Sequence, residues 1–309
     1  LQTMDASSFV RSLPPLFANE DEYRRFSERH QRNQVRVHEP KEITGRCALG
    51  IDAGSTTVKM VLINEQEEIL YSMYQPNQGN ALQLVREALI ELMRANPRME
   101  IVSSCVTGYG EDLIRSAFGV DAGIVETMAH FTASRKYMPD VDFIIDIGGQ
   151  DIKAISIDDN GSGKNYLMND KCAAGTGRFL EMMARTLGLS LEEMSTRGLE
   201  WKENVVISSM CTVFAESEVV SLVAQNKDVA DIIHGLNVSV ASKVGALAAR
   251  LGKKNPGEYM MTGGVARNKG IIQALEEKLG AKLYICDEAQ LCGALGAALF
   301  AYEKCNAAR

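Results

Sequence analysis

Asp52-Ala53-Gly54-Ser55-Thr56-Thr57-Val58-Lys59 decides the fold, because its pattern returns 94 positions later as Asp146-Ile147-Gly148-Gly149-Gln150-Asp151-Ile152-Lys153. Each copy has an aspartate at its start, a glycine two residues later and a lysine seven residues later. Each copy also follows a short apolar run and leads into a second one, which is typical of two strands joined by a tight polar loop. The repetition indicates an internal duplication, and the helical segments between the copies predict an α/β protein of two related lobes.

The loops have the chemistry expected of a triphosphate site. Small residues let backbone N–H groups approach phosphate oxygens, and a carboxylate can hold Mg²⁺ through water. We therefore predict that Asp52 and Asp146 are catalytic. The predicted cofactor-binding residues in the two loops are Gly54, Ser55, Thr56, Thr57, Lys59, Gly148, Gly149, Gln150 and Asp151. Lys59 and Lys153 could reach a phosphate or lie on a solvated strand face, and the sequence leaves both readings open.

A third glycine turn follows an apolar run at residues 259–266. We expect Gly263, Gly264 and Val265 to lie against the adenosine of a bound nucleotide. Gly161-Ser162-Gly163-Lys164 is not a P-loop, because Asp158 occupies the first glycine position and Asn165 replaces the Ser/Thr. No G-x-G-x-x-G follows a predicted strand, so a dinucleotide fold is unsupported.

Composition restricts the partners. The chain has 309 residues, and 33 basic against 40 acidic residues give a net charge of −7. This balance argues against nucleic acid or an anionic membrane as the main partner. The longest apolar run, at 291–302, is shorter than the roughly 20 residues of a membrane span, and no secretory leader is seen. Seven irregularly spaced cysteines favour reduced thiols. We expect a cytoplasmic protein.

Apolar patterning divides the chain into three parts. Residues 1–46 show no sustained apolar periodicity and are predicted to be a linker with one charged helix around residues 20–30. Lobe I is expected over 47–144 and lobe II over 145–309, with the last helix able to pack back on lobe I. Helices are predicted near 82–92, 111–118, 232–251 and 290–302, and strands at 102–106 and 143–147.

Cys172 and Cys211 each precede a run that can continue as a helix. A helix N-terminus favours the thiolate, which is the form that binds metal. Two thiolates per chain could complete the four of a cubane iron–sulfur cluster only if two chains met across a twofold axis. On spacing alone the reading as small buried hydrophobes is favoured, because isolated cysteines are more often of that kind. Lys171 and Arg178 beside Cys172 could form a docking patch or be ordinary solvated residues.

These motifs together resemble the ATP-dependent activators of 2-hydroxyacyl-CoA dehydratases, whose relatives include the ATPase subunits of benzoyl-CoA reductase. The resemblance rests on residues 50–57, 146–151, 169–177, 211–216 and 262–266. It implies the fold of the actin, hexokinase and acetate kinase superfamily, and a homodimer with one [4Fe-4S] cluster bound by Cys172 and Cys211. It further implies an ATPase, with ATP/ADP and Mg²⁺, that passes one electron from ferredoxin or flavodoxin to an iron–sulfur dehydratase. Residues 1–46 depart from the short activators.

Three other readings remain open at this point. The chain could be a small-molecule kinase of the same fold with structural cysteines, which predicts a colourless protein. It could be a nucleotide-gated regulator without electron transfer. It could also be the ATPase component of a benzoyl-CoA reductase-type enzyme.

Overall fold

The computed structural model describes residues 35–38, 42–157, 164–169, 172–208, 211–252 and 257–307. The helix expected around residues 20–30, the Gly161–Gly163 turn and Lys171 lie outside the described residues.

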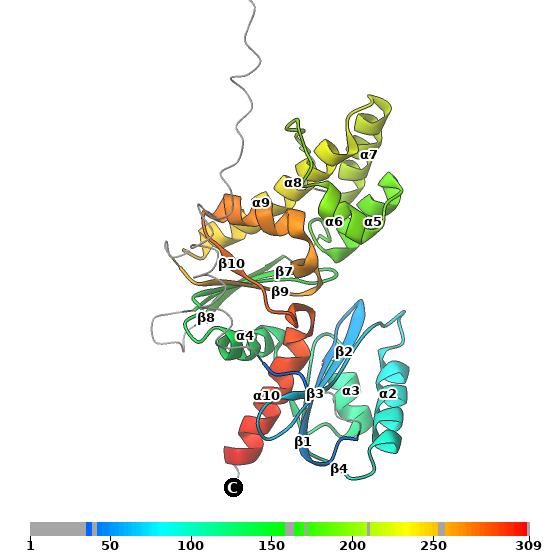
Figure 1. Ribbon diagram of the computed structural model, residues 1–309, viewed down its shortest axis with the longest axis vertical. Helices are drawn as coiled ribbons and strands as arrows, with labels where there is room; N and C mark the ends of the chain where they lie inside the picture. Colours follow the sequence, from blue (N-terminus) through cyan, green and yellow to red (C-terminus); the bar gives the residue numbers. More distant parts are fainter. Residues whose placement is uncertain are drawn as a thin grey trace, which may run out of the picture.

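Each lobe is built on a five-stranded sheet (Figure 1). The first has the order β3-β2-β1-β4-β5, and the second has the matching order β8-β7-β6-β9-β10 when read from its opposite edge. In both, the first strand is antiparallel to the second and parallel to the fourth. The register pairs Asp52 with Lys59 in one sheet and Asp146 with Lys153 in the other. The predicted duplicated α/β architecture is thereby confirmed.

The strands of the first sheet are β1 (Gly45–Ala53), β2 (Thr57–Ile63), β3 (Ile69–Pro76), β4 (Met99–Thr107) and β5 (Ala122–Gly123). Those of the second are β6 (Phe143–Ile147), β7 (Ile152–Ile157), β8 (Lys164–Asn169), β9 (Tyr259–Thr262) and β10 (Leu283–Tyr284). Helices α2 (Ala81–Ala95) and α3 (Glu111–Phe118) cover the first sheet, with a core of their own. Valine and isoleucine dominate the buried strands, as is usual when both faces are covered.

Helices α5 (Gly177–Leu187), α6 (Leu191–Arg197), α7 (Thr212–Ala224), α8 (Val229–Arg250) and α9 (Lys269–Leu279) lie on the side of the second sheet away from the first (Figure 1). Short 3₁₀ turns at Gly264–Arg267 and Ala289–Leu291 follow β9 and β10. By length and composition alone α8 could cross a membrane, but 56% of its most apolar window is buried in the protein. We therefore regard α8 as a core helix of the protein.

Two helices, α4 (Glu126–Tyr137) and α10 (Cys292–Ala307), lie between the sheets (Figure 1). Helix α10 contacts α4 and also strands β1, β2 and β4 of the first sheet. Glycine makes this approach possible. A Cβ on Gly296 would lie 1.8 Å from the backbone oxygen of Ala129 in α4, and one on Gly50 would lie 1.9 Å from that of Ala294. Any side chain at either position would separate the elements.

Several predicted boundaries were wrong. Strand β1 begins at Gly45, inside the expected linker, and Val37 forms a bridge with Ile69. Val35 and Ile43 are buried, so the end of the predicted linker packs against the first lobe. Strand β4 extends beyond 102–106, α8 begins three residues earlier than expected, and α10 begins at Cys292 and continues to Ala307.

Candidate nucleotide and thiolate sites

The two duplicated loops face each other. Each is closed by the same backbone hydrogen bond, in which Gly54 donates to Thr57 and Gly148 donates to Asp151, both at 3.0 Å. A Cβ on Gly149 would lie 2.1 Å from Oγ1 of Thr56, so the loops meet at these two residues. The predicted residues of both copies are thus brought together from the two sheets. Ser55 and Gln150 are exposed beside this contact.

In the first copy, Lys59 neutralises Asp52. Its Nζ lies 2.9 Å from Oδ2 of the aspartate, which is 2% exposed. Burial alone would lower the pKa of Lys59, but Asp52 outweighs it and the pKa is raised. Oδ1 of Asp52 is buried without a hydrogen-bond partner among the described residues. Lys59 is therefore a partner of the aspartate and does not lie on a solvated strand face.

In the second copy, Asp146 has three partners. Lys153 Nζ lies 3.4 Å from Oδ2, Thr262 donates a 3.0 Å hydrogen bond to Oδ1, and His130 Nδ1 lies 3.4 Å from Oδ1. Burial would raise the pKa of Asp146, but His130, Lys153 and the hydrogen bond from Thr262 together hold it below its ordinary value. Burial lowers the pKa of His130, and the Asp146 carboxylate opposes this effect. Asp146 is therefore held as a buried carboxylate.

Lys153 is the centre of this group of charges. Its Nζ also lies 2.8 Å from Asp151 and 3.2 Å from Glu126 Oε1. Burial alone would lower the pKa of Lys153, but the three carboxylates outweigh it and the pKa is raised. Lys153 is 2% exposed, so the reading of a solvated lysine is wrong here as well.

Glu126 and His130 of α4 were missed by the sequence analysis. Burial, opposed by Lys153 and reinforced by Asp52, Asp146 and Asp151, raises the pKa of Glu126 to about 7. Ligand atoms of Glu126, His130 and Asp146 lie within 4.8 Å of one another, as in a metal site. The Lys153 ammonium is already in contact with both carboxylates, so we assign no metal to this group. No loop motif marks these helix residues in the sequence.

The third glycine turn lies beside the second loop. A Cβ on Gly263 would lie 2.3 Å from the Ile147 backbone oxygen and 2.8 Å from Asp146 Oδ1, and Gly263 has a φ of 89°. A Cβ on Gly264 would lie 3.3 Å from the Tyr74 hydroxyl of β3, so the turn also reaches the first lobe. The Val265 side chain is buried in the core, which leaves only its backbone to face a ligand.

Cys172 and Cys211 are both near Lys243 of α8. Burial lowers the pKa of Lys243, and the two thiols oppose this effect. The Lys243 Cδ lies 3.7 Å from a Cβ built on Gly175, three residues after Cys172. Cys211 is exposed and is the N-cap residue of α7, whereas Cys172 is half-buried and precedes the N-cap of α5 by four residues. The structure therefore places both thiols, the ligand atoms that the resemblance implies, beside the same cation.

The second loop is hydrogen-bonded to the start of α5. The amide of Gly177 donates to the Gly148 oxygen and that of Arg178 to the Gly149 oxygen, both at 2.9 Å. These bonds join a predicted phosphate loop to the helix that follows Cys172. The Arg178 side chain pairs with Glu181 at 2.7 Å.

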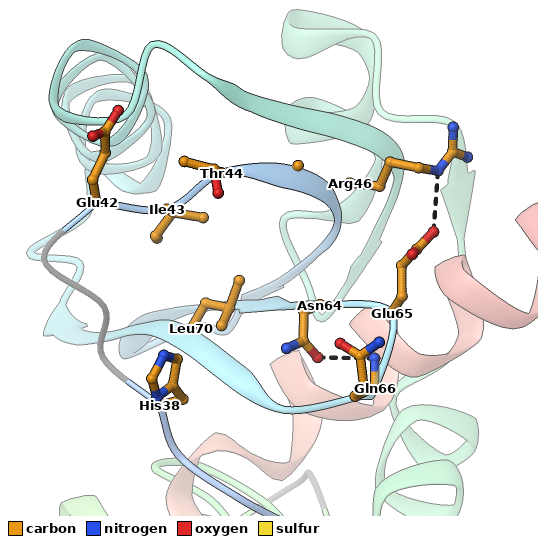
Figure 2. Close-up of a pocket in the computed structure, with 10 residues that line it drawn as sticks. His38, Glu42, Ile43, Thr44, Arg46, Asn64, Glu65, Gln66 and Leu70 are labelled. Carbon is orange, nitrogen blue, oxygen red and sulfur yellow. Dashed lines mark hydrogen bonds and ion pairs between the residues drawn. The ribbon is translucent and has the colours of Figure 1, made fainter.

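A shallow pocket of about 290 Å³ lies elsewhere, between the segment before β1 and the β2–β3 turn (Figure 2). Its polar lining includes an Arg46–Glu65 ion pair of 3.3 Å. The pocket lies at the start of β1, whereas Asp52 lies near the end of this strand. At ~3.3 Å per strand residue, the two are roughly 20 Å apart. None of the predicted site residues lines it.

Comparisons with known proteins agree with this geometry. A 2-hydroxyisocaproyl-CoA dehydratase activator of Clostridioides difficile is 40% identical over 258 residues, covering 83% of this chain and 95% of that protein. One of the subunits of the benzoyl-CoA reductase of Thauera aromatica is 30% identical over 270 residues, covering 82% of this chain and 94% of that protein. The resemblance inferred from the motifs is confirmed.

Solved structures support the fold. The activator of the 2-hydroxyisocaproyl-CoA dehydratase from Clostridium difficile, with bound ADPNP, has a TM-score of 0.77 and 38% identity, covering 85% of this chain and 96% of that chain. A ROK family glucokinase from Streptomyces griseus, with a TM-score of 0.52, 13% identity and coverage of 83% and 99%, shares the fold alone. The predicted actin- and hexokinase-like fold is confirmed. The model of the BadF/BadG/BcrA/BcrD ATPase family matches residues 49–301, and the chain therefore belongs to this family of ATPases.

Proposed function

We propose that this chain is an ATP-hydrolysing one-electron donor that reductively activates a 2-hydroxyacyl-CoA dehydratase or a similar low-potential iron–sulfur partner. The observation that carries the proposal is the approach of Cys172 and Cys211 to one lysine, next to a helix that is hydrogen-bonded to a phosphate loop. The names of the relatives give the partner class.

In this proposal a nucleotide lies between the two loops, with its adenosine against Gly263 and Gly264. Asp52 and Asp146 would hold Mg²⁺ through water. The buried Oδ1 of Asp52, which lacks a hydrogen-bond partner among the described residues, fits this role. Backbone N–H groups of both loops would stabilise the charge on the transferring phosphoryl group.

A [4Fe-4S] cluster shared by a homodimer fits the thiol positions. Cys172 and Cys211 of each chain would hold it, and the cluster would supply a low-potential electron. A second copy is supported by the surface next to Cys211, where α7 exposes Val213 and Phe214 by 63% and 67%, and also Val220 and Val223. Apolar side chains in such a group usually mark an interface.

The coupling between nucleotide and thiols would use the start of α5. A nucleotide that draws the Gly148–Gly149 backbone inward would move the Gly177 and Arg178 amides bonded to it, and with them the segment of Cys172. Such a shift requires that ATP bind the two arrangements with different affinity. We further propose ferredoxin or flavodoxin as the electron donor and a cytoplasmic location, with neither nucleic acid nor a membrane as partner.

The test is anaerobic purification followed by measurement of iron, acid-labile sulfide and the visible spectrum. We expect about four iron atoms per dimer, lost in Cys172→Ala and in Cys211→Ala. Cys305→Ala is the matched control, because this half-buried thiol lies near the end of α10 and should leave the iron content unchanged. A colourless protein that phosphorylates a small molecule would refute the proposal.

A second candidate is the ATPase component of a benzoyl-CoA reductase-type enzyme, favoured by the likeness to the Thauera aromatica protein. Both candidates predict the same iron content. Electron transfer to a purified dehydratase, compared with transfer to a benzoyl-CoA reductase, separates them.

A further inference from the structure

Asn77 holds the carbonyl groups of the first loop, residues 54–56, from outside the loop. It directly follows β3 and is 8% exposed. Its backbone N–H donates to the Thr56 oxygen at 3.0 Å, and its side-chain Nδ2 donates to the Gly54 oxygen at 2.8 Å. Its Oδ1 accepts from the Gly79 N–H at 2.9 Å. One buried asparagine therefore joins the turn after β3 to the loop after β1.

The bond to Gly54 sets the direction of the next amide. In a planar trans peptide, the C=O of one residue and the N–H of the following residue point to opposite sides. Because the Gly54 oxygen points to Asn77, the Ser55 N–H points away from it, and no described residue accepts a hydrogen bond from this N–H. A Cβ on Gly54 would lie 3.4 Å from Lys59 Nζ and 3.7 Å from Asp52 Oδ1, so this peptide borders the charged pair of the first copy.

The turn after β3 fixes the Asn77 side chain. The Asn80 N–H donates to the Asn77 oxygen at 2.7 Å, and Gln78 and Gly79 between them have φ values of 47° and 82°. Two central residues with positive φ are typical of a type I′ turn. Asparagine supplies both the acceptor for the Gly79 N–H and the donor for Gly54, whereas an ionised aspartate supplies acceptors alone.

The second loop has the same bond from a different donor. Gly148 is the counterpart of Gly54 in the duplicated pattern, and its oxygen accepts from the Gly177 N–H at 2.9 Å. Asn77 follows the third strand of its sheet, β3, and Gly177 follows the third strand of the other sheet, β8. One donor is a side-chain amide and the other is the first backbone N–H of α5. The same contact made by different groups indicates that the direction of this carbonyl matters in both loops.

We propose that Asn77 is a positioning residue of the nucleotide site, which holds the first loop so that the Ser55 N–H is directed at a phosphate oxygen. Asn77 acts through the Gly54–Ser55 peptide and does not itself contact the nucleotide. The inference rests on the proposed placement of the nucleotide between the loops, and it does not depend on the cluster.

The test compares Asn77→Asp with wild type, in anaerobically purified protein, for the binding of adenosine and of a non-hydrolysable ATP analogue with Mg²⁺. Aspartate keeps the acceptor for the Gly79 N–H but places a carboxylate oxygen against the Gly54 oxygen, so the peptide between Gly54 and Ser55 should turn. We expect the Kd of the analogue to rise by about 5- to 30-fold. The Kd of adenosine should stay unchanged, because adenosine has no phosphate for the loop to bind.

Asn80→Asp is the matched control. It makes the same substitution three residues later in the same turn, and the Asn80 side chain accepts from the Gln83 N–H at 3.3 Å, which aspartate can also do. The variant adds the same charge near the loop without changing the bond to Gly54. It should bind both ligands like wild type.

Unchanged affinity of Asn77→Asp for the analogue would overturn the proposal, and so would an equal loss of affinity for analogue and adenosine. An equal loss in Asn80→Asp would overturn it as well, because the added charge would then be the cause. If Asn77→Asp fails to fold, Asn77→Ala removes the side chain and keeps the backbone bond to Thr56; analogue binding like that of wild type in this variant would contradict the proposal. Equal affinity of wild type for adenosine and the analogue would instead refute the placement of the phosphates between the loops, and this inference with it.

Discussion

Glu126→Gln should stabilise the nucleotide-free protein, and it should do so mainly above neutral pH. Glu126 has a pKa of about 7 in the folded chain and an ordinary value of 4.5 when exposed. Between these values the folded chain binds more protons at Glu126 than the unfolded chain. The free energy of unfolding therefore decreases as the pH rises through this interval.

The size of the effect follows from the two pKa values. By linkage, the ionisation of Glu126 lowers the free energy of unfolding by about 3 kcal/mol at pH 8 and by less than about 1 kcal/mol at pH 5. Glutamine has nearly the same shape and no charge, so it removes this cost. We expect Glu126→Gln to exceed wild type in stability by about 2–3 kcal/mol at pH 8 and by little at pH 5.

Urea unfolding followed by the emission of Trp201 provides the assay. Trp201 is the only tryptophan of the chain and stacks on His234 of α8, with ring centroids 3.9 Å apart. Glu91→Gln, at an exposed position of α2, is the control for replacing a carboxylate with an amide. A stability difference between Glu126→Gln and wild type that is the same at both pH values would refute the reasoning, as would a loss of stability at pH 8.

Three further predictions concern other contacts. Lys153→Met leaves Glu126, Asp146 and Asp151 without the ammonium group that they contact. In urea unfolding at pH 8, the free energy of unfolding should fall by about 3–5 kcal/mol, and this loss should shrink as the carboxylates are protonated at lower pH. A loss that does not depend on pH would contradict this prediction. Gly296→Ala should lower the free energy of unfolding by about 1–3 kcal/mol, despite the higher helix propensity of alanine. Gly245→Ala meets only the flexible Lys278 side chain and should be neutral or stabilising. Equal effects in the two variants would exclude the close helix crossing. Gly177→Pro removes the amide that donates to Gly148, and proline suits the first position of a helix. In iron-free protein, the effect of nucleotide on maleimide labelling of Cys172 should therefore disappear in this variant. Gly177→Ala keeps the amide and should retain the effect.

The parts of the site that lie in local repeats could be predicted from the sequence. The spacing of seven from Asp52 to Lys59, and from Asp146 to Lys153, already implies that the residues are opposite each other in a hairpin. The two-lobe fold followed from this repetition. The sequence could not show that the lysines are buried, because burial depends on the helices that cover the hairpins.

The residues that were missed reach the site through tertiary packing. Glu126 and His130 belong to a helix with no distinctive motif, and their proximity to Asp146 depends on how α4 is placed between the sheets. Lys243 lies 71 positions after Cys172 and reaches the thiols only through the tertiary packing of α8, which contacts α7. The structured residues before Cys47 were missed because Val37 pairs with an edge strand from outside the regular sheet.

The glycine contacts of α10 restrict how the two halves of the molecule can move. The backbone of α4 lies against Gly296 of α10, and the backbone of α10 lies against Gly50 of β1. Sliding α10 along α4 by about one turn would bring Cys292 or Phe300, which are four residues from Gly296, to a place where no Cβ fits. These contacts therefore oppose sliding of α10, and a motion of the two sheets that keeps them is a turn about α10, with the greatest displacement at the outer strands.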